Sequence, residues 1–363
     1  MLIVGGGPAG LASAIAARAK GLRVTVVDSR KPPIDKACGE GLLPEGVAAL
    51  ENLGVDLRAA SPIPFAGIRF SSEHFSASAQ FERGTAFGLR RTALHKLLFE
   101  HAASAGVAFA WGARLSAFDG SAAQVNGEWI GFRWLIGADG QQSIVRRFAN
   151  LGRDLRGPAR FGFRRHYAVA PWTDLVEVHW GDRCQMVVTP TGAQETCISL
   201  FTGDFRLRID DALRQFPLVA RRLRGVQPVS ALAGAITSLG RARAATRHNI
   251  ALVGDASGAV DGIAGQGLSL AFGQAQALGE ALGRGDLALY ASAHRRIMHG
   301  ASRMTRLLLL MNASAAIRRK ALRLFATHPS VFARLMSVHA GEASSRALNP
   351  AQVLGLGWRV LCS

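Results

Sequence analysis

The residue types and spacing most suggestive of chemistry lie at 250–267, well after the start of the chain. Residues 250–253 are apolar and short enough for a buried strand, and the Gly-Asp pair at 254–255 turns the chain out of it. The sequence Gly-Gln-Gly at 265–267 then opens an apolar helical run that begins at Leu268. Glycines at a helix start let a ligand approach free backbone N–H groups, which carry the positive end of the helix dipole. We therefore expect an anionic or electron-rich ligand at this loop.

A second glycine-rich loop stands at the beginning of the sequence. Residues 2–4 form a minimal buried strand, residues 5–10 are Gly-Gly-Gly-Pro-Ala-Gly, and an alanine-rich helical run follows at 11–20. A second strand, at 22–27, ends at Asp28. This order is typical of a dinucleotide-binding unit, in which the glycines permit close approach of a pyrophosphate and the acid binds ribose hydroxyls.

Two further segments combine glycine, acid and arginine. Glu40 lies between two glycines just after Cys38. The segment is either a loop pressed against a ligand or an irregular connection, and Glu40 either acts on the ligand or caps a backbone turn. Cys38 either faces the ligand or, as we prefer, is a small buried filler. Arg90 and Arg91 precede a helix predicted at 93–105, where the helix dipole disfavours cations unless they meet an anion.

The middle of the chain changes from helical to strand-like patterns. Residues 134–140 form another short buried strand that runs into a polar loop. Residues 67–87 alternate as a hairpin, and residues 160–201 alternate with no helix signal. We expect a mostly antiparallel sheet inserted between two parts of the nucleotide-binding unit, with part of one face lining an apolar pocket.

Positive charge is concentrated towards the C-terminus. The net formal charge is +18, and residues 287–341 contain no Asp or Glu. Helical spacing from about 271 to 326, broken by Pro329, favours an amphipathic layer packed on the nucleotide-binding unit with its arginines outward. Peripheral contact with an anionic membrane is the alternative, whereas nucleic acid is disfavoured because no module for it is present. The basic residues of this segment are Arg295, Arg296, Arg303, Arg306, Arg318, Arg319, Lys320, Arg323 and Arg334.

Length and composition bound the remaining possibilities. With 363 residues, 49% of them hydrophobic, the chain predicts a globular protein of two or three structural units. Its four cysteines have neither disulfide-framework nor metal-ligand spacing, which predicts no metal site and a reducing, cytoplasmic environment. No signal-peptide pattern follows Met1, and no apolar run approaches the roughly 20 residues of a membrane span.

Three motifs, at 5–10 with Asp28, at 137–147 and at 254–267, stand in an order that resembles the FAD-binding signature of the class A flavoprotein monooxygenase and geranylgeranyl reductase superfamily. The resemblance covers about the first 285 residues. It implies an α/β fold, with a glutathione-reductase-type FAD-binding Rossmann domain, an inserted antiparallel β-sheet substrate domain and a C-terminal helical segment. The implied bounds are 1–60 with 86–150 and 240–285 for the discontinuous FAD domain, 61–85 with 151–239 for the β-sheet domain, and 286–363 for basic amphipathic helices.

The resemblance also implies how FAD is held. The first glycine loop and Asp255 would meet the pyrophosphate, Asp28 the adenosine ribose and Arg91 a phosphate, while the flavin ring would lie over residues 265–267. Helix N–H groups at that place would stabilise the negative charge of a reduced flavin. The implied cofactor-binding residues are Gly5, Gly7, Pro8, Ala9, Gly10, Asp28, Ser29, Arg30, Cys38, Gly39, Arg91, Asp139, Gly140, Gly254, Asp255, Gly265, Gln266, Gly267 and Leu268.

Differences from the family pattern reduce the number of activities that the sequence favours. Gly258 and Gly262 stand where aromatic hydroxylases commonly carry a histidine and a proline. Together with the segment around Cys38, this loop resembles the geranylgeranyl reductase branch and related bacterial enzymes of secondary metabolism. The Trp-x-Trp-x-Ile-Pro motif of flavin halogenases is absent, which disfavours halogenation.

The leading hypothesis is an FAD-dependent monooxygenase that uses transiently bound NAD(P)H and O2 to hydroxylate or epoxidise a hydrophobic, aromatic or polyketide-type metabolite. The alternative is a geranylgeranyl-reductase-like enzyme that saturates isoprenoid double bonds without oxygen. A third hypothesis is a non-catalytic flavin-binding redox or docking module. The catalytic candidates are Glu40 and His179. His166 and His179 both lie in the predicted sheet, where each is either a general base or a satisfied core or surface histidine.

Overall fold

A six-stranded sheet brings together segments from both ends of the chain. The computed structural model describes residues 1–152, 154–155, 159–237 and 239–342. The strand order is β20-β21-β12-β1-β2-β8, parallel except for β20 at one edge. The first two strands are joined by a crossover helix, as in a dinucleotide-binding unit. The strands are β1 (Leu2–Val4), β2 (Thr25–Asp28), β8 (Ala108–Trp111), β12 (Leu135–Gly137), β20 (Thr246–Arg247) and β21 (Ile250–Leu252).

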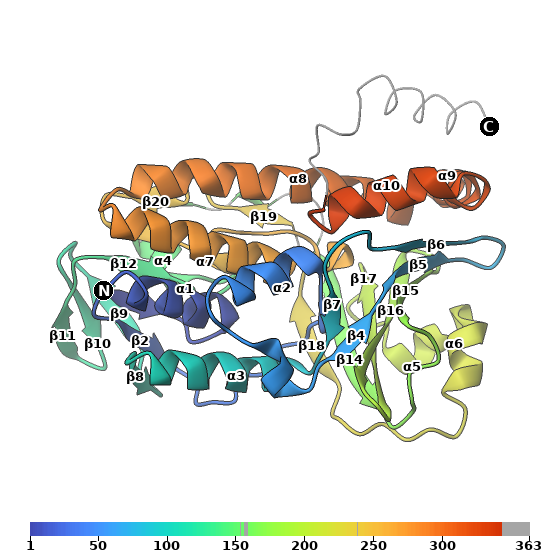
Figure 1. Ribbon diagram of the computed structural model, residues 1–363, viewed down its shortest axis with the longest axis horizontal. Helices are drawn as coiled ribbons and strands as arrows, with labels where there is room; N and C mark the ends of the chain where they lie inside the picture. Colours follow the sequence, from blue (N-terminus) through green and yellow to red (C-terminus); the bar gives the residue numbers. More distant parts are fainter. Residues whose placement is uncertain (153, 156–158, 238, 343–363) are drawn as a thin grey trace.

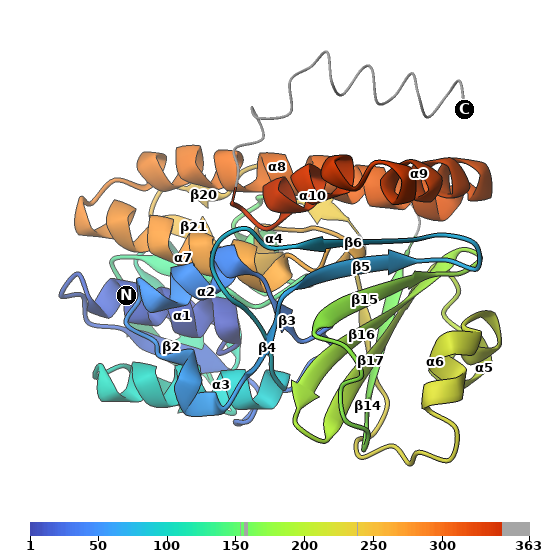
Figure 2. The same ribbon diagram turned by 45° about the vertical axis from the view of Figure 1, so that its right-hand side comes forward.

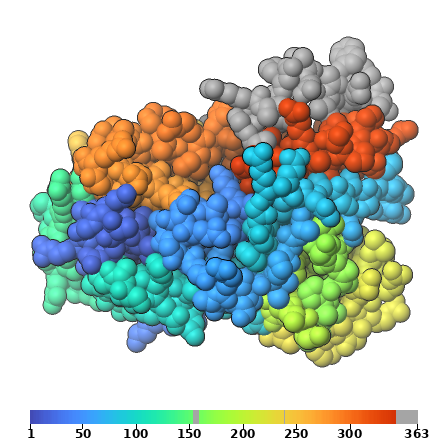
Figure 3. Space-filling model, in the orientation of Figure 1, coloured from blue at the N-terminus to red at the C-terminus, as the bar shows by residue number. Residues whose placement is uncertain are grey.

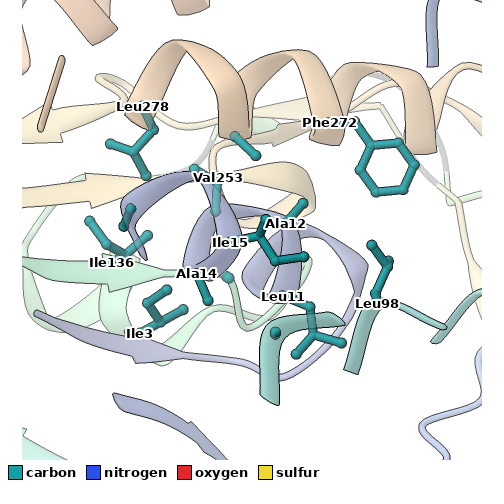
Figure 4. Packing of buried hydrophobic residues seen from close by; sticks show 14 of the residues in the cluster. Ile3, Leu11, Ala12, Ala14, Ile15, Leu98, Ile136, Val253, Phe272 and Leu278 are labelled. Atoms are coloured by element: carbon teal, nitrogen blue, oxygen red, sulfur yellow. The ribbon is translucent and has the colours of Figure 1, made fainter. Parts of the chain in front are cut away.

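The two faces of this sheet bury alternate residues of each strand, because successive side chains point in opposite directions. Ile3 and Ile136 pack against helices α1 (Pro8–Arg18), α3 (Arg91–Ser104) and α7 (Gly267–Gly283), as Figure 4 shows. The opposite face of the sheet packs against helix α4 and a three-stranded meander. These elements are α4 (Ile144–Phe148), β9 (Leu115–Phe118), β10 (Ala122–Val125) and β11 (Glu128–Gly131).

A seven-stranded sheet forms the other half of the molecule. Its order is β18-β14-β17-β16-β15-β5-β6, and all neighbours are antiparallel except β15 and β5. Short helices α5 (Ile209–Ala212) and α6 (Pro217–Arg222) cover one face of it (Figure 2). The strands are β5 (Gly67–Ser71), β6 (Ser76–Gln80), β14 (Phe161–Tyr167), β15 (Leu175–Trp180), β16 (Cys184–Gly192), β17 (Glu195–Thr202) and β18 (Ala233–Ile236).

Short elements join the two halves. Helix α2 (Pro44–Glu51) packs on α7, and β3 (Gly41–Leu42), β7 (Ala86–Gly88) and β4 (Ile63–Phe65) form a small sheet beside it. A second small sheet contains β13 (Asp154–Leu155), β19 (Gly240–Arg241) and β22 (Gly258–Ala259).

The C-terminal helices form a layer over both halves (Figures 1 and 3). They are α8 (Leu287–Ala313), α9 (Ala315–Thr327) and α10 (Pro329–His339). Pro329 begins α10 rather than ending the helical region, because a proline at the first helical position gives up no intrahelical hydrogen bond. Helix α8 packs on α7, but α9 and α10 pack on β6, with Phe325 and Phe332 among the buried side chains. The prediction that the whole layer covers the nucleotide-binding unit is therefore wrong for α9 and α10.

The predicted fold class, an α/β domain with an inserted, mostly antiparallel sheet and C-terminal helices, is confirmed. The domain bounds at 60–61, 85–86, 150–151, 239–240 and 285–286 stay a prediction, and residues 343–363 of the last domain lie outside the described residues. No helix in the described part of the chain is long and apolar enough to cross a membrane.

Candidate functional site

A cavity of about 510 Å³ lies between the two large sheets and collects the three sequence motifs. The carboxyl ends of β1, β12 and β21 deliver the three loops to it, because parallel strands end at the same edge of their sheet. All of the residues predicted to bind a cofactor line the cavity except Gly10 and Gln266. The sequence motifs therefore identified three segments that are distant in the sequence but line the same side of one cavity.

Glycines in these loops serve two different purposes. A Cβ at Gly10 would stand 1.8 Å from the carbonyl oxygen of Gly5, and a Cβ at Gly5 would stand 2.3 Å from that of Ala138. These two glycines allow β1, α1 and β12 to approach closely. A Cβ at Gly7 or Gly267 would meet nothing within 4 Å, so their backbones are open to the cavity.

Asp28 is held at the end of β2 by backbone N–H groups. Its Oδ2 accepts from the Gly6 amide at 2.8 Å, and its Oδ1 accepts from the Arg30 amide at 2.8 Å. Each carboxylate oxygen has a second lone pair, so the side chain keeps acceptor capacity towards the cavity that it lines.

Asp139 caps helix α4 from the loop after β12. Its Oδ2 accepts from the amides of Ile144 at 2.6 Å and Val145 at 3.2 Å. Burial raises the pKa of Asp139, although these hydrogen bonds act to lower it. Its Oδ1 is buried and has no partner among the described residues.

Asp255 lies in the loop after β21, paired with Lys36 at 2.7 Å. Side chains of α7 and α8 hold this loop from behind. Gln274 Oε1 accepts from the Gly254 amide at 2.7 Å, and His294 Nε2 lies 2.8 Å from the hydroxyl of Ser257. Burial lowers the pKa of His294 to about 4, which keeps its imidazole neutral near pH 7. The sequence analysis missed Gln274 and His294, because nothing in helical spacing marks a polar residue that supports a loop.

A family model described as an FAD binding domain matches residues 1–192, more than half of the chain. The chain belongs to this FAD-binding family. The prediction from the three motifs is confirmed, and the protein is an FAD-dependent oxidoreductase.

Curated relatives carry a narrower name. A menaquinone reductase of Mycolicibacterium smegmatis is 32% identical over 185 residues, which cover 47% of this chain and 44% of that protein. A menaquinone reductase of Mycobacterium tuberculosis is 28% identical over 319 residues, which cover 79% of this chain and 77% of that protein. The chain is thus matched over less than half the length of the first relative and over about three quarters of the second.

Solved structures share the fold. A flavoprotein/dehydrogenase from Cytophaga hutchinsonii has a TM-score of 0.80 at 19% identity and covers 94% of this chain and 92% of its own. A p-nitrophenol 4-monooxygenase from Pseudomonas putida has a TM-score of 0.79 at 16% identity and covers 94% of this chain and 98% of its own. At these identities the similarity establishes the architecture alone.

The cavity residues fit FAD. Open glycine backbones at the starts of α1 and α7 present N–H groups where anionic and electron-rich groups of the cofactor are stabilised. Two buried polar atoms in the cavity-lining residues, Arg91 Nε and Asp139 Oδ1, have no partner among the described residues, as expected of groups that meet a ligand. The individual contacts with FAD stay predictions.

Glu40 lies in the cavity wall in a strained conformation. Its φ of 60° is in the left-handed region, and the residue is 2% exposed. Its Oε1 accepts from the Arg91 amide at 3.0 Å and lies 3.7 Å from Arg164 Nε, and its Oε2 lies 2.5 Å from His166 Nε2. The carboxylate is therefore part of a buried polar network and does more than cap a turn.

Cys38 also lines the cavity. It is half-buried, and its Sγ accepts a weak hydrogen bond from the Glu40 amide at 3.4 Å. The preferred interpretation of Cys38 as a buried filler is therefore wrong, because the loop turns the residue towards the cavity.

Three ligand atoms within 4.8 Å of one another come from Glu40, His166 and Cys197. The nearby Arg164 guanidinium repels a cation, and burial raises the pKa of Cys197 well above its usual range. These features favour a hydrogen-bonded cluster over a metal centre. The expectation of no metal site, which rested on the spacing of the cysteines, stays a prediction.

His179 points away from the cavity. It follows Val178 on β15, and because side chains alternate along a strand, Val178 lines the cavity while His179 packs beside Phe216 behind the sheet. His179 Nε2 lies 3.0 Å from Glu177 Oε2. This placement supports the satisfied-core interpretation of His179 and gives no support to its role as a base.

Gln266 and His339 join the loop at 265–267 to the C-terminal layer. Gln266 Nε2 donates to the His339 carbonyl at 2.8 Å, so this side chain braces the loop without lining the cavity. His339 itself lines the cavity, and burial lowers its pKa to about 4. The sequence did not indicate that His339 lies at the cavity, because a single histidine on an amphipathic helix is common and predicts no particular role.

One end of the cavity is apolar. Residues of β5, β15 and β16 in the seven-stranded sheet line it together with Leu308 of α8 and Met336 of α10. Figure 1 shows these two helices above the sheet. The predicted apolar face of the sheet is thus present at β5, β15 and β16. The apolar lining residues at this end are Phe65, Ile68, Phe70, Val176, Val178, Val187, Leu308 and Met336.

Proposed function

We propose that this FAD-dependent oxidoreductase saturates a carbon–carbon double bond of a hydrophobic, isoprenoid-bearing substrate at the expense of NAD(P)H. The main support for this proposal is the apolar end of the cavity. Eight apolar side chains surround a space next to residues 265–267, where the flavin ring is expected to lie. Transfer of such a substrate into this space is favourable by roughly 25 cal/mol for each Å² of apolar surface removed from water. The menaquinone reductase relatives, aligned over up to 79% of the chain, support the same substrate class.

The chain's own groups have separate tasks in this reaction. When bound, FAD supplies the means to take hydride from NAD(P)H and pass it on. The N–H groups at the start of α7 stabilise negative charge at the flavin edge without a charged side chain. The closed apolar wall orients the substrate and excludes water. Glu40, the carboxylate of the polar network described above, also lines the cavity.

The test is an anaerobic turnover. Purified holoenzyme, NADPH and a menaquinone with an unsaturated side chain are incubated without oxygen, and the quinone is analysed by mass spectrometry. After any hydroquinone formed has been reoxidised in air, we expect a quinone whose side chain is heavier by one pair of hydrogen atoms, because hydride transfer to the double bond needs no oxygen. Met336→Trp, which fills the apolar end, should abolish turnover while FAD content stays unchanged. An absolute requirement for oxygen would reject the proposal.

Monooxygenation is the second candidate. Membership of the FAD-binding family, which the p-nitrophenol monooxygenase shares in fold, favours it. The same cavity would then hold an aromatic or polyketide-type substrate for hydroxylation or epoxidation. A product that carries one oxygen atom from labelled O2 supports this candidate, and turnover under anaerobic conditions opposes it. Family membership speaks against the third hypothesis, a non-catalytic flavin module.

We also propose that the C-terminal layer contacts an anionic membrane. Its apolar residues face the sheet, which leaves the arginines of α8 and α9 on the outer surface. Each basic residue near an anionic bilayer contributes about 1 kcal/mol. Leu308 of α8 and Met336 of α10 line the cavity, so a lipid-soluble substrate bound at this layer would lie near it. The exposed arginines of these two helices are Arg295, Arg296, Arg303, Arg306, Arg319 and Arg323.

Liposome co-sedimentation tests this contact. We expect the protein to sediment with vesicles that contain phosphatidylglycerol and to remain in solution with neutral phosphatidylcholine, because the attraction is electrostatic. The double variant Arg319→Glu/Arg323→Glu should lose sedimentation, whereas Arg206→Glu/Arg214→Glu, on the far side of the seven-stranded sheet, should retain it. Equal binding to both kinds of vesicle, or to neither, would contradict the proposal.

A further inference from the structure

A chain of hydrogen bonds leads from the cavity wall to the outside of the seven-stranded sheet. Glu40 Oε2 lies 2.5 Å from His166 Nε2, and His166 Nδ1 lies 2.9 Å from the hydroxyl of Ser230. Glu40 lines the cavity, His166 is 1% exposed, and Ser230 is half-buried in the surface segment before β18. Three side chains from segments far apart in the sequence thus connect the cavity to solvent.

The alternation of β14 explains why His166 can take part. Phe163 and Tyr167 pack behind the sheet with α5 and α6, so Arg164 and His166 point to the cavity side. Glu40 lies beside Nε2, while Nδ1 lies 2.9 Å from the Ser230 hydroxyl and 3.2 Å from Arg164 Nη1, which can only donate. An imidazole with a hydrogen-bonded group at each nitrogen can take a proton at one and release one at the other.

Two of the arginines near Glu40 have carboxylate partners of their own. Arg164 lies 3.7 Å from Glu40, but Asp35 accepts from Arg164 Nη2 at 2.7 and 2.8 Å and offsets its charge. Arg90 is likewise paired with Glu195. The Arg91 side chain also belongs to the cavity wall, and Cys197 lies at the edge of the cluster. Glu40 and His166 are therefore in direct contact, within a network in which Arg164 is paired with Asp35 and Arg90 with Glu195.

We propose that Ser230, His166 and Glu40 form a proton relay that supplies the cavity from solvent. This inference deepens the proposed function, on which it rests. Saturation of a double bond adds one hydride and one proton: the hydride comes from NAD(P)H by way of FAD, and the proton comes from water. The Ser230 hydroxyl passes a solvent proton to His166 Nδ1, Nε2 passes one to Glu40 Oε2, and Glu40 releases it in the cavity while the chain is reloaded from outside.

Reoxidation of the reduced holoenzyme by menadione tests the relay. Menadione is a quinone without an isoprenoid side chain, and its reduction to the hydroquinone also consumes hydride and protons. Holoenzyme is reduced anaerobically and mixed with menadione, and the return of oxidised flavin absorbance is followed. We expect His166→Ala to slow this step about 100-fold, the usual contribution of a positioned acid–base group, and added imidazole to restore part of the rate.

Two further variants make the result decisive. Glu40→Gln keeps a side chain that can hydrogen-bond to His166 but cannot carry a proton, so it should be slow and should not respond to imidazole. His179→Ala, which removes a buried histidine from the other face of the same sheet, should react at the wild-type rate. FAD content is measured for each variant, so that a loss of fold is distinguished from a loss of proton supply.

The outcomes separate this inference from the proposed function. Rescue of His166→Ala by imidazole supports the relay even if the wild type saturates no menaquinone, in which case only the proposed function fails. Wild-type rates in both His166→Ala and Glu40→Gln would overturn the relay, as would equal imidazole responses in His166→Ala and His179→Ala. A wild type that does not react with menadione would also overturn it, because the relay would then feed no quinone reduction in this cavity.

Discussion

Gly10→Val is expected to yield protein that contains no FAD. The Cβ alone would stand 1.8 Å from the Gly5 carbonyl oxygen and 3.2 Å from the side chain of Ala138. Backbone atoms cannot yield as a flexible side chain can, so α1 must move away from β1, and the glycine loop between them loses its shape. Flavin absorbance relative to protein absorbance after purification, together with thermal unfolding, measures both effects.

Gly7→Ala is the matched control for this variant. It adds the same kind of atom three residues earlier in the same loop, where nothing lies within 4 Å. The protein should fold, with an unfolding temperature of the apoprotein close to that of the wild type. Its FAD affinity should fall, because the methyl group enters the space that the loop leaves for the cofactor. Normal FAD content in Gly10→Val would show that the tight contact between α1 and β1 is not what shapes the loop.

The contrast between these glycines marks what could be predicted from sequence. The segment from Leu2 to Asp28 is a local strand, loop, helix and strand, so its pattern alone indicated the dinucleotide-binding unit. The pattern could not tell which glycines pack and which face the ligand. At Gly5 that distinction depends on Ala138, which follows β12 more than a hundred residues later.

Polar contacts between residues far apart in the sequence could not be predicted for the same reason. Periodicity placed His166 in a strand but gave no partner, and its contact with Glu40 spans 126 residues. Helical spacing likewise indicated that α9 is amphipathic but not which sheet its apolar face covers, and it did not extend to α10. Hydrophobic patterns state which face is buried, whereas the identity of the partner is decided by topology.

The second large effect concerns pH. The free energy of unfolding is expected to fall as pH falls from about 6.5 towards about 4, because two buried histidines are neutral in the folded state. Burial lowers the pKa of His294 and of His339 from 6.5 to about 4, and Arg241 and Arg295 add to the shift at His294. As pH falls, these histidines are therefore protonated in the unfolded chain before they are protonated in the folded protein. Each histidine can remove about 3 kcal/mol across this range.

Buried carboxyl groups act in the opposite direction. Burial raises the pKa of Asp139, Asp261 and Glu45, so these groups take up protons more readily in the folded state and add stability as pH falls through their raised pKa. Their effect overlaps the lower part of the histidine range. The histidine contribution must therefore be isolated by comparison with a variant rather than from one protein alone.

His294→Gln isolates it. The amide can still hydrogen-bond to Ser257 but does not titrate, so its loop support is retained while the proton linkage is removed. Urea unfolding of wild type and variant, both saturated with FAD, should show the wild type losing about 2 kcal/mol more between about pH 6.5 and about pH 5. Parallel pH curves would mean that His294 is as readily protonated in the folded protein as in the unfolded chain.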